Sequence, residues 1–331
     1  MKPFENLTSP GQARRLRLLA IKALREYDVT PERITLLHHW TNTVFRIDTD
    51  KGRYALRICQ PLGANGAKLV RSELRWLVAL KKHTGLDVPE PVSTQGNDLL
   101  TVVQGERVPG ARCCVLFSWV EGRFKHRDQL SPKTFDKVGG LMAKLHRHVE
   151  TSPPSQNFER PVVRYADPNN KTMLESLKMS EQFGTKKDAE FLRSAYKRMM
   201  GETEKIGRNP SDFNLIHADL HQENYLFFQG DVRVIDFDDC GWGHLMYDVA
   251  VPLLEVEHRD DFEELCAAFF EGYRRVRPLA TDAESQLSTF FVARRLLLNA
   301  WILGRSDNPE FQGLLGTTVP FTAERIKVHY P

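Results

Sequence analysis

The stretch LIHADLHQEN at residues 215–224, followed by VIDFD at residues 234–238, decides the fold of this chain. The two segments place Asp219, Asn224 and Asp236 in the order His-x-Asp-x-x-x-x-Asn, then an apolar strand that ends in Asp. Phosphoryl transfer from a magnesium-bound nucleoside triphosphate uses this order and spacing. The pattern therefore predicts a kinase.

The chemistry of phosphoryl transfer requires these residue types. Mg²⁺ takes oxygen ligands and usually binds through one or two carboxylates together with the phosphates of the nucleotide. We expect Asp236 to supply a carboxylate and Asn224 an amide oxygen, with ATP and Mg²⁺ as cofactors. A hydroxyl acceptor loses its proton as it attacks the γ-phosphoryl group, and a carboxylate within hydrogen-bond reach can accept that proton. Asp219 is therefore the predicted catalytic base.

The same residues have a simpler interpretation, in which Asp219 and Asn224 belong to an ordinary turn beside a half-buried strand. The residues between the two motifs argue against it. Apolar runs at 225–228 and 232–235, separated by a turn, predict a β-hairpin that brings Asn224 and Asp236 to the same end of two paired strands. The catalytic interpretation is favoured.

The segment at 215–238 resembles the Brenner-type motif of the aminoglycoside phosphotransferase and choline kinase-like superfamily. The likeness continues through DDCGWGHLMYDVA at 238–250, which is similar to the Asp-x-x-x-x-Gly-x-x-x-x-Asp-Leu-Ala stretch of that family. The resemblance implies an α+β, protein-kinase-like fold of two lobes, a small antiparallel-sheet lobe and a larger, mainly helical one. It also implies that Asp248 lies at a helix start and, with His217, braces the catalytic loop.

Composition agrees with a soluble enzyme, and a chain of 331 residues more readily forms two lobes than one. The net charge of +3 implies neither a nucleic-acid partner nor a membrane partner. No apolar run is as long as a bilayer span, and the first residues lack the form of a signal peptide. Five cysteines, with Cys113 and Cys114 adjacent, suit neither a disulfide framework nor a zinc site. We expect a cytoplasmic enzyme that is a monomer or a homodimer.

The first part of the chain has the pattern of a helix followed by short strands. Residues 10–27 predict an amphipathic helix, and strands are expected at 34–38, 43–48 and 54–58. In a kinase-like fold the loop between the first two strands covers the nucleotide phosphates. This loop has no glycine and so lacks the usual means of close backbone approach to phosphate. Asn42, with the neighbouring threonine hydroxyls, is the expected substitute.

The third strand carries Arg57 where protein kinases have the lysine that binds the α- and β-phosphates. The donors of an arginine suit phosphate oxygens, so we expect Arg57 to bind the nucleotide. Its predicted partner is Glu73 on the next helix. The alternative is a surface salt bridge between unrelated charges, and the order along the chain favours the functional pair.

Two more strands are expected, at 99–103 and 113–119. The resemblance implies that the main chain after the second of these reads the adenine edge, at residues such as Ser118 and Val120.

We expect an N-terminal lobe at 1–120 and a C-terminal lobe at 121–331. The second lobe has a mainly helical pattern, with Ser131 as a predicted N-cap. Its other helices are expected at 185–205, 244–256, 259–276 and 283–304. Turn-forming residues near 152–155 and 167–170 predict a linker-like insertion that frames the acceptor site.

The acceptor leaves the weakest signature in the sequence. Carboxylates and aromatic rings suit a cationic acceptor where they converge, but the favoured explanation of the acidic residues at 255–264 is a solvated helix face. Asp238 lies two residues beyond Asp236 and therefore on the same side of an extended segment. It is a candidate contact for the acceptor or for a second metal ion.

Three functions fit the motif. The first is a kinase for a small-molecule alcohol, such as an aminoglycoside, choline, ethanolamine or a homoserine-like compound. It is favoured because Ala218 and His221 stand where protein kinases usually carry Arg and Lys, and because no Ala-Pro-Glu segment lies between Asp236 and Asp248. The alternatives are a bacterial protein Ser/Thr kinase of similar fold and a non-catalytic nucleotide-binding module, which the intact motif disfavours.

Overall fold

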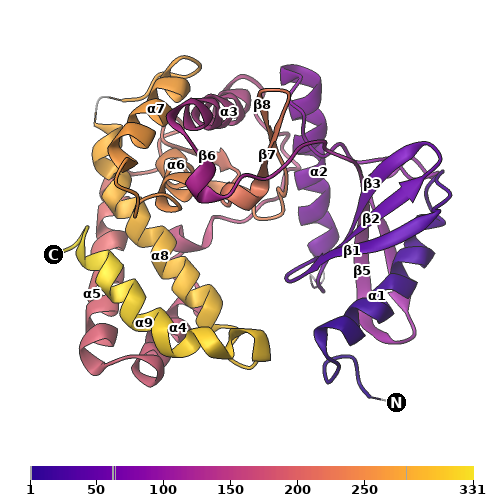
Figure 1. Ribbon diagram of the computed structural model, residues 1–331, viewed down its shortest axis with the longest axis horizontal. Helices are drawn as coiled ribbons and strands as arrows, with labels where there is room; N and C mark the ends of the chain where they lie inside the picture. The colour runs from indigo at the N-terminus through magenta and orange to yellow at the C-terminus, as the bar shows by residue number, and fades with distance from the viewer. Residues whose placement is uncertain (1, 62, 64, 281) are drawn as a thin grey trace. The chain divides into compact units, whose positions relative to one another are not determined.

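Figure 1 shows a computed structural model of the chain, which describes residues 2–61, 63, 65–280 and 282–331. The chain forms two compact units. Unit 1 contains the chain up to Arg123 with the segments Pro154–Arg160 and Arg233–Asp238, and unit 2 contains Phe124–Pro153, Pro161–Val232 and Asp239–Pro331. The two short segments of unit 1 were not expected from the sequence. The first is held there because Glu159 N donates to Ser72 Oγ at 2.9 Å.

Unit 1 contains a five-stranded antiparallel sheet in the order β1-β2-β3-β5-β4. The strands are β1 (Arg33–His39), β2 (Thr43–Thr49), β3 (Gly52–Ile58), β4 (Thr101–Gly105) and β5 (Val108–Ser118). Consecutive strands form hairpins, except that β3 pairs with β5 and leaves β4 at the edge. The expected antiparallel sheet is confirmed, with strand ends displaced by a few residues.

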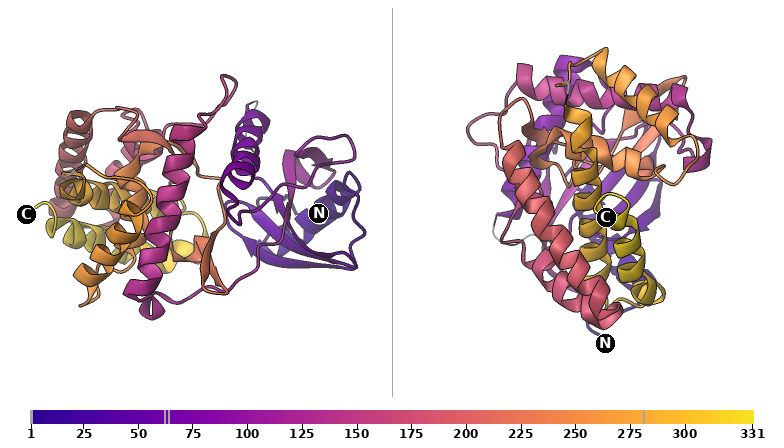
Figure 2. Two further views of the ribbon diagram at one scale, coloured as in Figure 1. Left: turned by 90° about the horizontal axis from the view of Figure 1, so that it is seen from above. Right: turned by 90° about the vertical axis from the view of Figure 1, so that its left-hand side faces the viewer.

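The core of unit 1 lies between this sheet and α1 (Ser9–Leu24), which covers one face of it in Figures 1 and 2. Along β2, Phe45 and Ile47 are buried while their neighbours are less so, as the two-residue period of a strand with one covered face requires. These side chains belong to the same apolar cluster as Leu16 and Leu19 of α1. The second helix, α2 (Gly66–Thr84), ends at Gly85, whose φ of 67° forms a left-handed C-cap.

Unit 2 is mainly helical. Its helices are α3 (Pro132–Thr151), α4 (Lys171–Phe183), α5 (Lys186–Ile206), α6 (Leu245–Leu254), α7 (Phe262–Arg274), α8 (Leu287–Leu303) and α9 (Gln312–Lys327). Single 3-10 turns lie at Arg127–Gln129, Arg164–Ala166, Gln222–Asn224, Ala283–Gln286 and Pro309–Phe311. The right-hand view of Figure 2 looks onto α5, α8 and α9, which pack together. The predicted two-part α+β fold is confirmed.

Four short strands flank residues 217–224, the segment that carries the predicted base. β6 (Phe213–Ile216) pairs antiparallel with β9 (Gly241–His244). β7 (Tyr225–Phe228) and β8 (Asp231–Val234) form a second two-stranded sheet, so the expected hairpin is confirmed. Its turn residues Gln229 and Gly230 have φ of 49° and 87°, the left-handed values that a two-residue hairpin turn favours.

Two glycines let α3 and α7 approach at backbone contact. A Cβ atom on Gly139 of α3 would clash with the carbonyl oxygen of Phe269, and one on Gly272 of α7 would clash with that of Asp136. Only glycine allows such an approach without displacing the helices. The crossing matters for the site, because both helices carry side chains of the catalytic loop's hydrogen-bond network.

Two helices were missed from the sequence. α4 begins directly after Asn170, whose side chain accepts a hydrogen bond from Met173 N as an N-cap, but the turn-forming residues before it favoured a linker. α9 contains Pro320, an ordinary helix breaker, yet it buries Leu315, Val319 and Ala323 at helical spacing. Tertiary packing therefore outweighs the local signal at both places.

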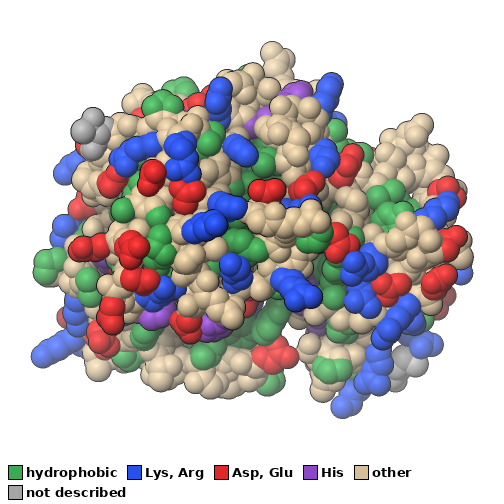
Figure 3. Space-filling model, turned by 45° about the horizontal axis from the view of Figure 1, so that its top comes forward, with side chains coloured by type: hydrophobic (Ala, Val, Ile, Leu, Met, Phe, Trp, Pro, Cys, Tyr) green, Lys and Arg blue, Asp and Glu red, His purple; other side chains and the backbone are tan. Residues whose placement is uncertain are grey.

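The surface carries charges of both signs. On the face shown in Figure 3, basic and acidic side chains are interspersed, in keeping with a net charge of +3. Within the described part of the chain, no helix combines the length and the apolar character that a membrane crossing needs.

Candidate active site

The predicted catalytic loop, residues 217–224 of unit 2, leaves β6 and turns sharply at Ala218, whose φ is 70°. A left-handed backbone is unfavourable for a residue with a Cβ atom and persists only where the surroundings impose it. Asp219 follows directly, and the carbonyl oxygen of Asp219 accepts a hydrogen bond from His221 N at 2.8 Å. The strained turn thus sets the position of the predicted base.

Asp248, near the start of α6, holds the backbone at Ala218 in this conformation. Its Oδ1 accepts a hydrogen bond from Ala218 N at 2.7 Å and its Oδ2 from His217 N at 3.0 Å. The carboxylate is fully buried, and burial alone would raise its pKa. The hydrogen bond and charge of His146, followed by those of His217, instead hold the pKa of Asp248 below its ordinary value. Asp248 is therefore an ionised anchor for the two amides that precede Asp219.

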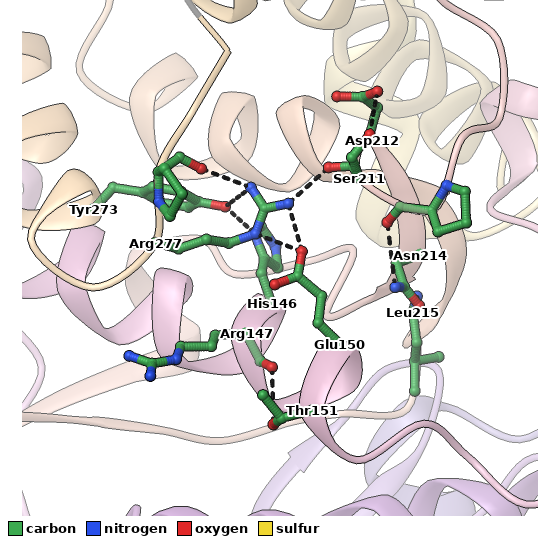
Figure 4. Close-up of polar contacts among 12 residues, drawn as sticks. His146, Arg147, Glu150, Thr151, Ser211, Asp212, Asn214, Leu215, Tyr273 and Arg277 are labelled. Atoms are coloured by element: carbon green, nitrogen blue, oxygen red, sulfur yellow. Dashed lines mark hydrogen bonds and ion pairs between the residues drawn. The ribbon is translucent and has the colours of Figure 1, made fainter.

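A buried network extends from Asp248 into α3 and α7. His146 Nε2 lies 3.1 Å from Asp248 Oδ2, and His146 Nδ1 lies 2.7 Å from the Tyr273 hydroxyl. Figure 4 shows the next members: Arg277 donates to Tyr273 and, at 2.6 and 2.9 Å, to one carboxylate oxygen of Glu150. The network fixes the catalytic loop to two helices whose backbones are already in contact.

Asn224 is buried beside Asp219, the predicted base. Its Nδ2 donates to the Asp219 carbonyl oxygen at 2.8 Å and approaches one Asp219 carboxylate oxygen at 3.4 Å. With the amide nitrogen turned toward Asp219, its Oδ1 remains as the acceptor end of the side chain. An amide oxygen is a donor type that Mg²⁺ accepts.

The carboxylate of Asp219 has a partner that was not predicted, Arg294 of α8. Nη2 of Arg294 lies 2.5 Å from Oδ1 of Asp219. The Arg294 side chain is 11% exposed and that of Asp219 23% exposed. Burial alone would lower the pKa of Arg294, but the negative charge of Asp219 and the side chain of Tyr247 raise it above its ordinary value. A charged residue inside the apolar run at 290–298 signals a buried partner, although the sequence does not say which one.

In unit 1, Arg57 and Glu73 form a bidentate pair. Nη1 and Nη2 of Arg57 donate to the two carboxylate oxygens of Glu73 at 2.8 and 2.7 Å. The side chains are 6% and 1% exposed, so the alternative of a surface salt bridge is wrong. Burial would lower the pKa of Arg57, and the charge of Glu73 raises it well above its ordinary value. The buried Nε of Arg57 has no hydrogen-bond partner among the described residues, which leaves a donor that suits a phosphate oxygen.

The glycine-free loop between β1 and β2 is held by Asn42. Its Nδ2 donates to Oδ2 of Asp238 at 2.5 Å, and its Oδ1 accepts from Gln60 N at 3.3 Å. Near the loop ends, His39 Nδ1 lies 2.7 Å from the Thr43 hydroxyl. The structure thus brings Asn42 and Asp238 together, two residues that the sequence placed in different roles.

Asp236 lies two residues beyond the end of β8, in the segment Arg233–Asp238 of unit 1. Its φ is 63°, a left-handed value for a residue other than glycine. The next residue, Phe237, is buried and packs edge-on against Trp76 of α2 with ring centroids 5.3 Å apart. Strained residues of this kind gather at functional sites, and the buried Phe237 ring fixes the backbone beside Asp236.

At the end of β5, some main-chain hydrogen-bonding groups already have partners within the protein. Ser118 N donates to the carbonyl oxygen of Glu90 at 2.8 Å, and the Ser118 hydroxyl accepts from Glu90 N at 3.1 Å. The amide of Ser118 is therefore already paired. Ser118 and Val120, the two residues expected to read the adenine edge, are both half-buried.

The donor set fits a magnesium nucleotide. Asp236 and Asn224 offer oxygen atoms, the ligand type that Mg²⁺ prefers. Among the residues that the structure describes, no group of three or more His, Cys, Asp and Glu side chains forms a metal site. A magnesium ion that takes several of its ligands from phosphates and water does not need such a group.

Comparison with known proteins identifies the family. The model of the phosphotransferase enzyme family matches residues 33–279, more than half of the chain. The chain is 23% identical to amicoumacin kinase of Bacillus subtilis over 76% of its length and 74% of the relative, and 27% identical to homoserine kinase of Neisseria meningitidis over 75% of each. The solved structure of a microcompartment-associated aminopropanol kinase superposes with a TM-score of 0.80 at 26% identity, covering 93% of this chain and 95% of that one. The chain is a phosphotransferase that acts on hydroxyl groups, and it belongs to the phosphotransferase enzyme family.

Proposed function

We propose that this protein is an ATP-dependent kinase that transfers the γ-phosphoryl group to a hydroxyl group of a small amino alcohol. The observation that carries the proposal is the Asp219 carboxylate, partly exposed at the end of a strained loop that Asp248 holds by two main-chain amides. The acceptor class is supported by the aminopropanol and homoserine kinases to which the chain is similar, since both compounds carry an amine and a hydroxyl group.

In the proposed reaction the acceptor oxygen forms a bond to the γ-phosphorus. The bond from that phosphorus to the bridging oxygen breaks, and ADP leaves with the electron pair. The proton of the acceptor hydroxyl passes to a carboxylate oxygen of Asp219. Asp248 acts on this step as a positioning residue, because it fixes the backbone directly before the base.

The nucleotide-binding roles are assigned residue by residue. Asp236 and Asn224 are the proposed oxygen ligands of Mg²⁺, which when bound neutralises phosphate charge. Arg57, held by Glu73, is the proposed phosphate donor, and its unpaired Nε supports this role.

Two further contacts of unit 1 complete the assignment. The main chain at Val120 is the proposed adenine contact. Asn42 and Asp238 hold each other, so we propose that their contact shapes the phosphate loop of unit 1.

An acceptor panel tests the proposal. ADP release is measured with ethanolamine, choline, homoserine and 1-amino-2-propanol, and with 1,2-propanediol as the matched alcohol without an amine. We expect at least one amino alcohol to stimulate ADP release well above the propanediol rate. Stimulation by the diol alone would contradict the amino-alcohol class. Phosphate incorporation into protein Ser or Thr, with every small alcohol inactive, would support the protein-kinase alternative instead.

A further inference from the structure

The catalytic loop carries no lysine or arginine beside its base. Protein kinases usually have Lys two residues after the catalytic Asp, and this chain has His221 at that position. The cation comes instead from α8, seventy-five residues further along the chain, where Arg294 Nη2 contacts Asp219 Oδ1. A positive charge therefore lies against the proposed base although the loop motif does not supply one.

Arg294 is held from a second side by Tyr247 in the first turn of α6, which it hydrogen-bonds. The Tyr247 ring stacks on Tyr165, with centroids 4.2 Å apart. Burial raises the pKa of Tyr247 to about 12, so the phenol is neutral and brings no negative charge. Among the described residues, Asp219 is the one carboxylate that forms an ion pair with Arg294.

The proposed reaction removes that counter-charge. When Asp219 accepts the proton of the acceptor, its carboxylate becomes neutral, and a buried guanidinium without an anionic partner is unfavourable. At the same moment the transferring phosphoryl group carries negative charge on its three equatorial oxygens. The guanidinium has five donors in a planar fork, of which one is used on Asp219. Arg294 therefore keeps donors beyond those used on Asp219 and Tyr247, and these can bind a second anion.

We propose that Arg294 is a catalytic residue that binds the transferring phosphoryl group as Asp219 becomes protonated. The inference rests on the proposed function, because it requires Asp219 as the proton acceptor. Bond changes are those of the phosphoryl transfer itself: the acceptor oxygen bonds to phosphorus, ADP leaves with the electron pair, and the proton goes to Asp219. Arg294 keeps its own protons throughout, since a guanidinium is not deprotonated in proteins.

The competing explanation is that Arg294 only orients Asp219. A phosphoryl-transfer mimic separates the two, because aluminium fluoride with Mg-ADP imitates the planar transferring group. We would measure the affinity of each variant for Mg-ADP alone and for Mg-ADP with aluminium fluoride. For Arg294→Gln we expect unchanged affinity for Mg-ADP, within about twofold, and a loss of roughly 10²-fold or more in the fluoride complex. Arg294→Lys should recover part of that loss.

The Asp219→Asn background makes the test decisive. The double variant with Arg294→Gln removes both charges of the pair together, so neither is left unpaired. If Arg294 contacts the phosphoryl group, Arg294→Gln weakens the fluoride complex in this background as well. If the loss appears only when Asp219 is present, Arg294 merely positions the base, and the proposal is overturned while the kinase function stands. A wild-type protein that binds neither complex would overturn the proposed function and this inference with it.

Arg295, the next residue of α8, provides a matched control. It forms a buried pair with Glu257, and that carboxylate keeps Arg325 and His329 as partners when Arg295 is changed. Arg295→Gln should leave the affinity for the fluoride complex unchanged. An equal loss in Arg295→Gln would show that damage to α8 explains the effect, which would overturn the proposal.

Discussion

The Arg57–Glu73 pair of unit 1 and the Arg294–Asp219 pair of unit 2 join the same chemical groups in different ways. The first is bidentate and almost completely buried. The second is made through one nitrogen and one oxygen, and its carboxylate is 23% exposed. A closed pair cannot exchange partners without leaving a buried charge alone, whereas a single, partly exposed contact can. The difference fits the proposed roles: the closed pair holds Arg57 in one position, and the more open pair leaves Arg294 able to bind a second anion.

Asp219→Asn should give the largest effect. The amide retains an oxygen for Arg294 but cannot accept the acceptor's proton, so we expect turnover to fall by about 10²- to 10⁴-fold. Affinity for Mg-ADP should stay close to that of the wild type, as measured by calorimetric titration. Glu223→Gln, an exposed change in the same loop, is the control and should keep its turnover. A parallel loss of nucleotide binding in Asp219→Asn would make Asp219 a metal ligand or a structural residue.

Glu73→Gln tests the closed pair. Removing one charge leaves the buried Arg57 uncompensated, which should lower the free energy of unfolding by about 3–5 kcal/mol in urea titrations. Asp219→Asn should lower it by less, because its pair is more exposed. Glu121→Gln is the control: it breaks the Arg53–Glu121 pair, whose side chains are 45% and 44% exposed, and should change stability by no more than about 1 kcal/mol. Equal losses at Glu73 and Asp219 would remove the distinction between the two pairs.

A third pair, Glu257 with Arg295, gives a pH signature. Burial alone would raise the pKa of Glu257, but the His329 hydrogen bond and the charge of Arg295 lower it from 4.5 to about 2. A folded-state pKa below the unfolded one stabilises the protein above pH 4.5, and this contribution is lost as the pH falls toward 2. Glu257→Gln should therefore flatten the dependence of unfolding free energy on pH between 4.5 and 2. Glu263→Gln, an exposed control, should leave that slope in place.

Residues that lie close together in sequence were predictable. Asp219, Asn224 and Asp236 lie within one short stretch, so their spacing can be recognised from the sequence alone. The hairpin between the last two follows from strand and turn patterns. The Arg57–Glu73 contact spans only a strand and the next helix, so the order of elements was enough to suggest it. The roles of these residues in binding and catalysis stay predictions that the variants above will test.

Long-range partners were not predictable from one sequence. Arg294 meets Asp219 across seventy-five residues, and several arginines of the second unit could have filled that place on sequence grounds. Asn42 and Asp238 meet across 196 residues. Such contacts are set by how the elements pack, and periodicity within a single element carries no record of them. The same reason explains α9, whose interior proline is tolerated because the helix is packed on its neighbours.

The crossing of α3 and α7 has a consequence for how this enzyme can diversify. At Gly139 and Gly272 even a methyl group has no room, so a mutational scan should find almost no tolerated replacement at these two positions. Heritable variation within α3 and α7 is therefore confined to positions away from this crossing. A laboratory selection for new acceptors would gain by leaving Gly139 and Gly272 untouched and placing its diversity at other positions.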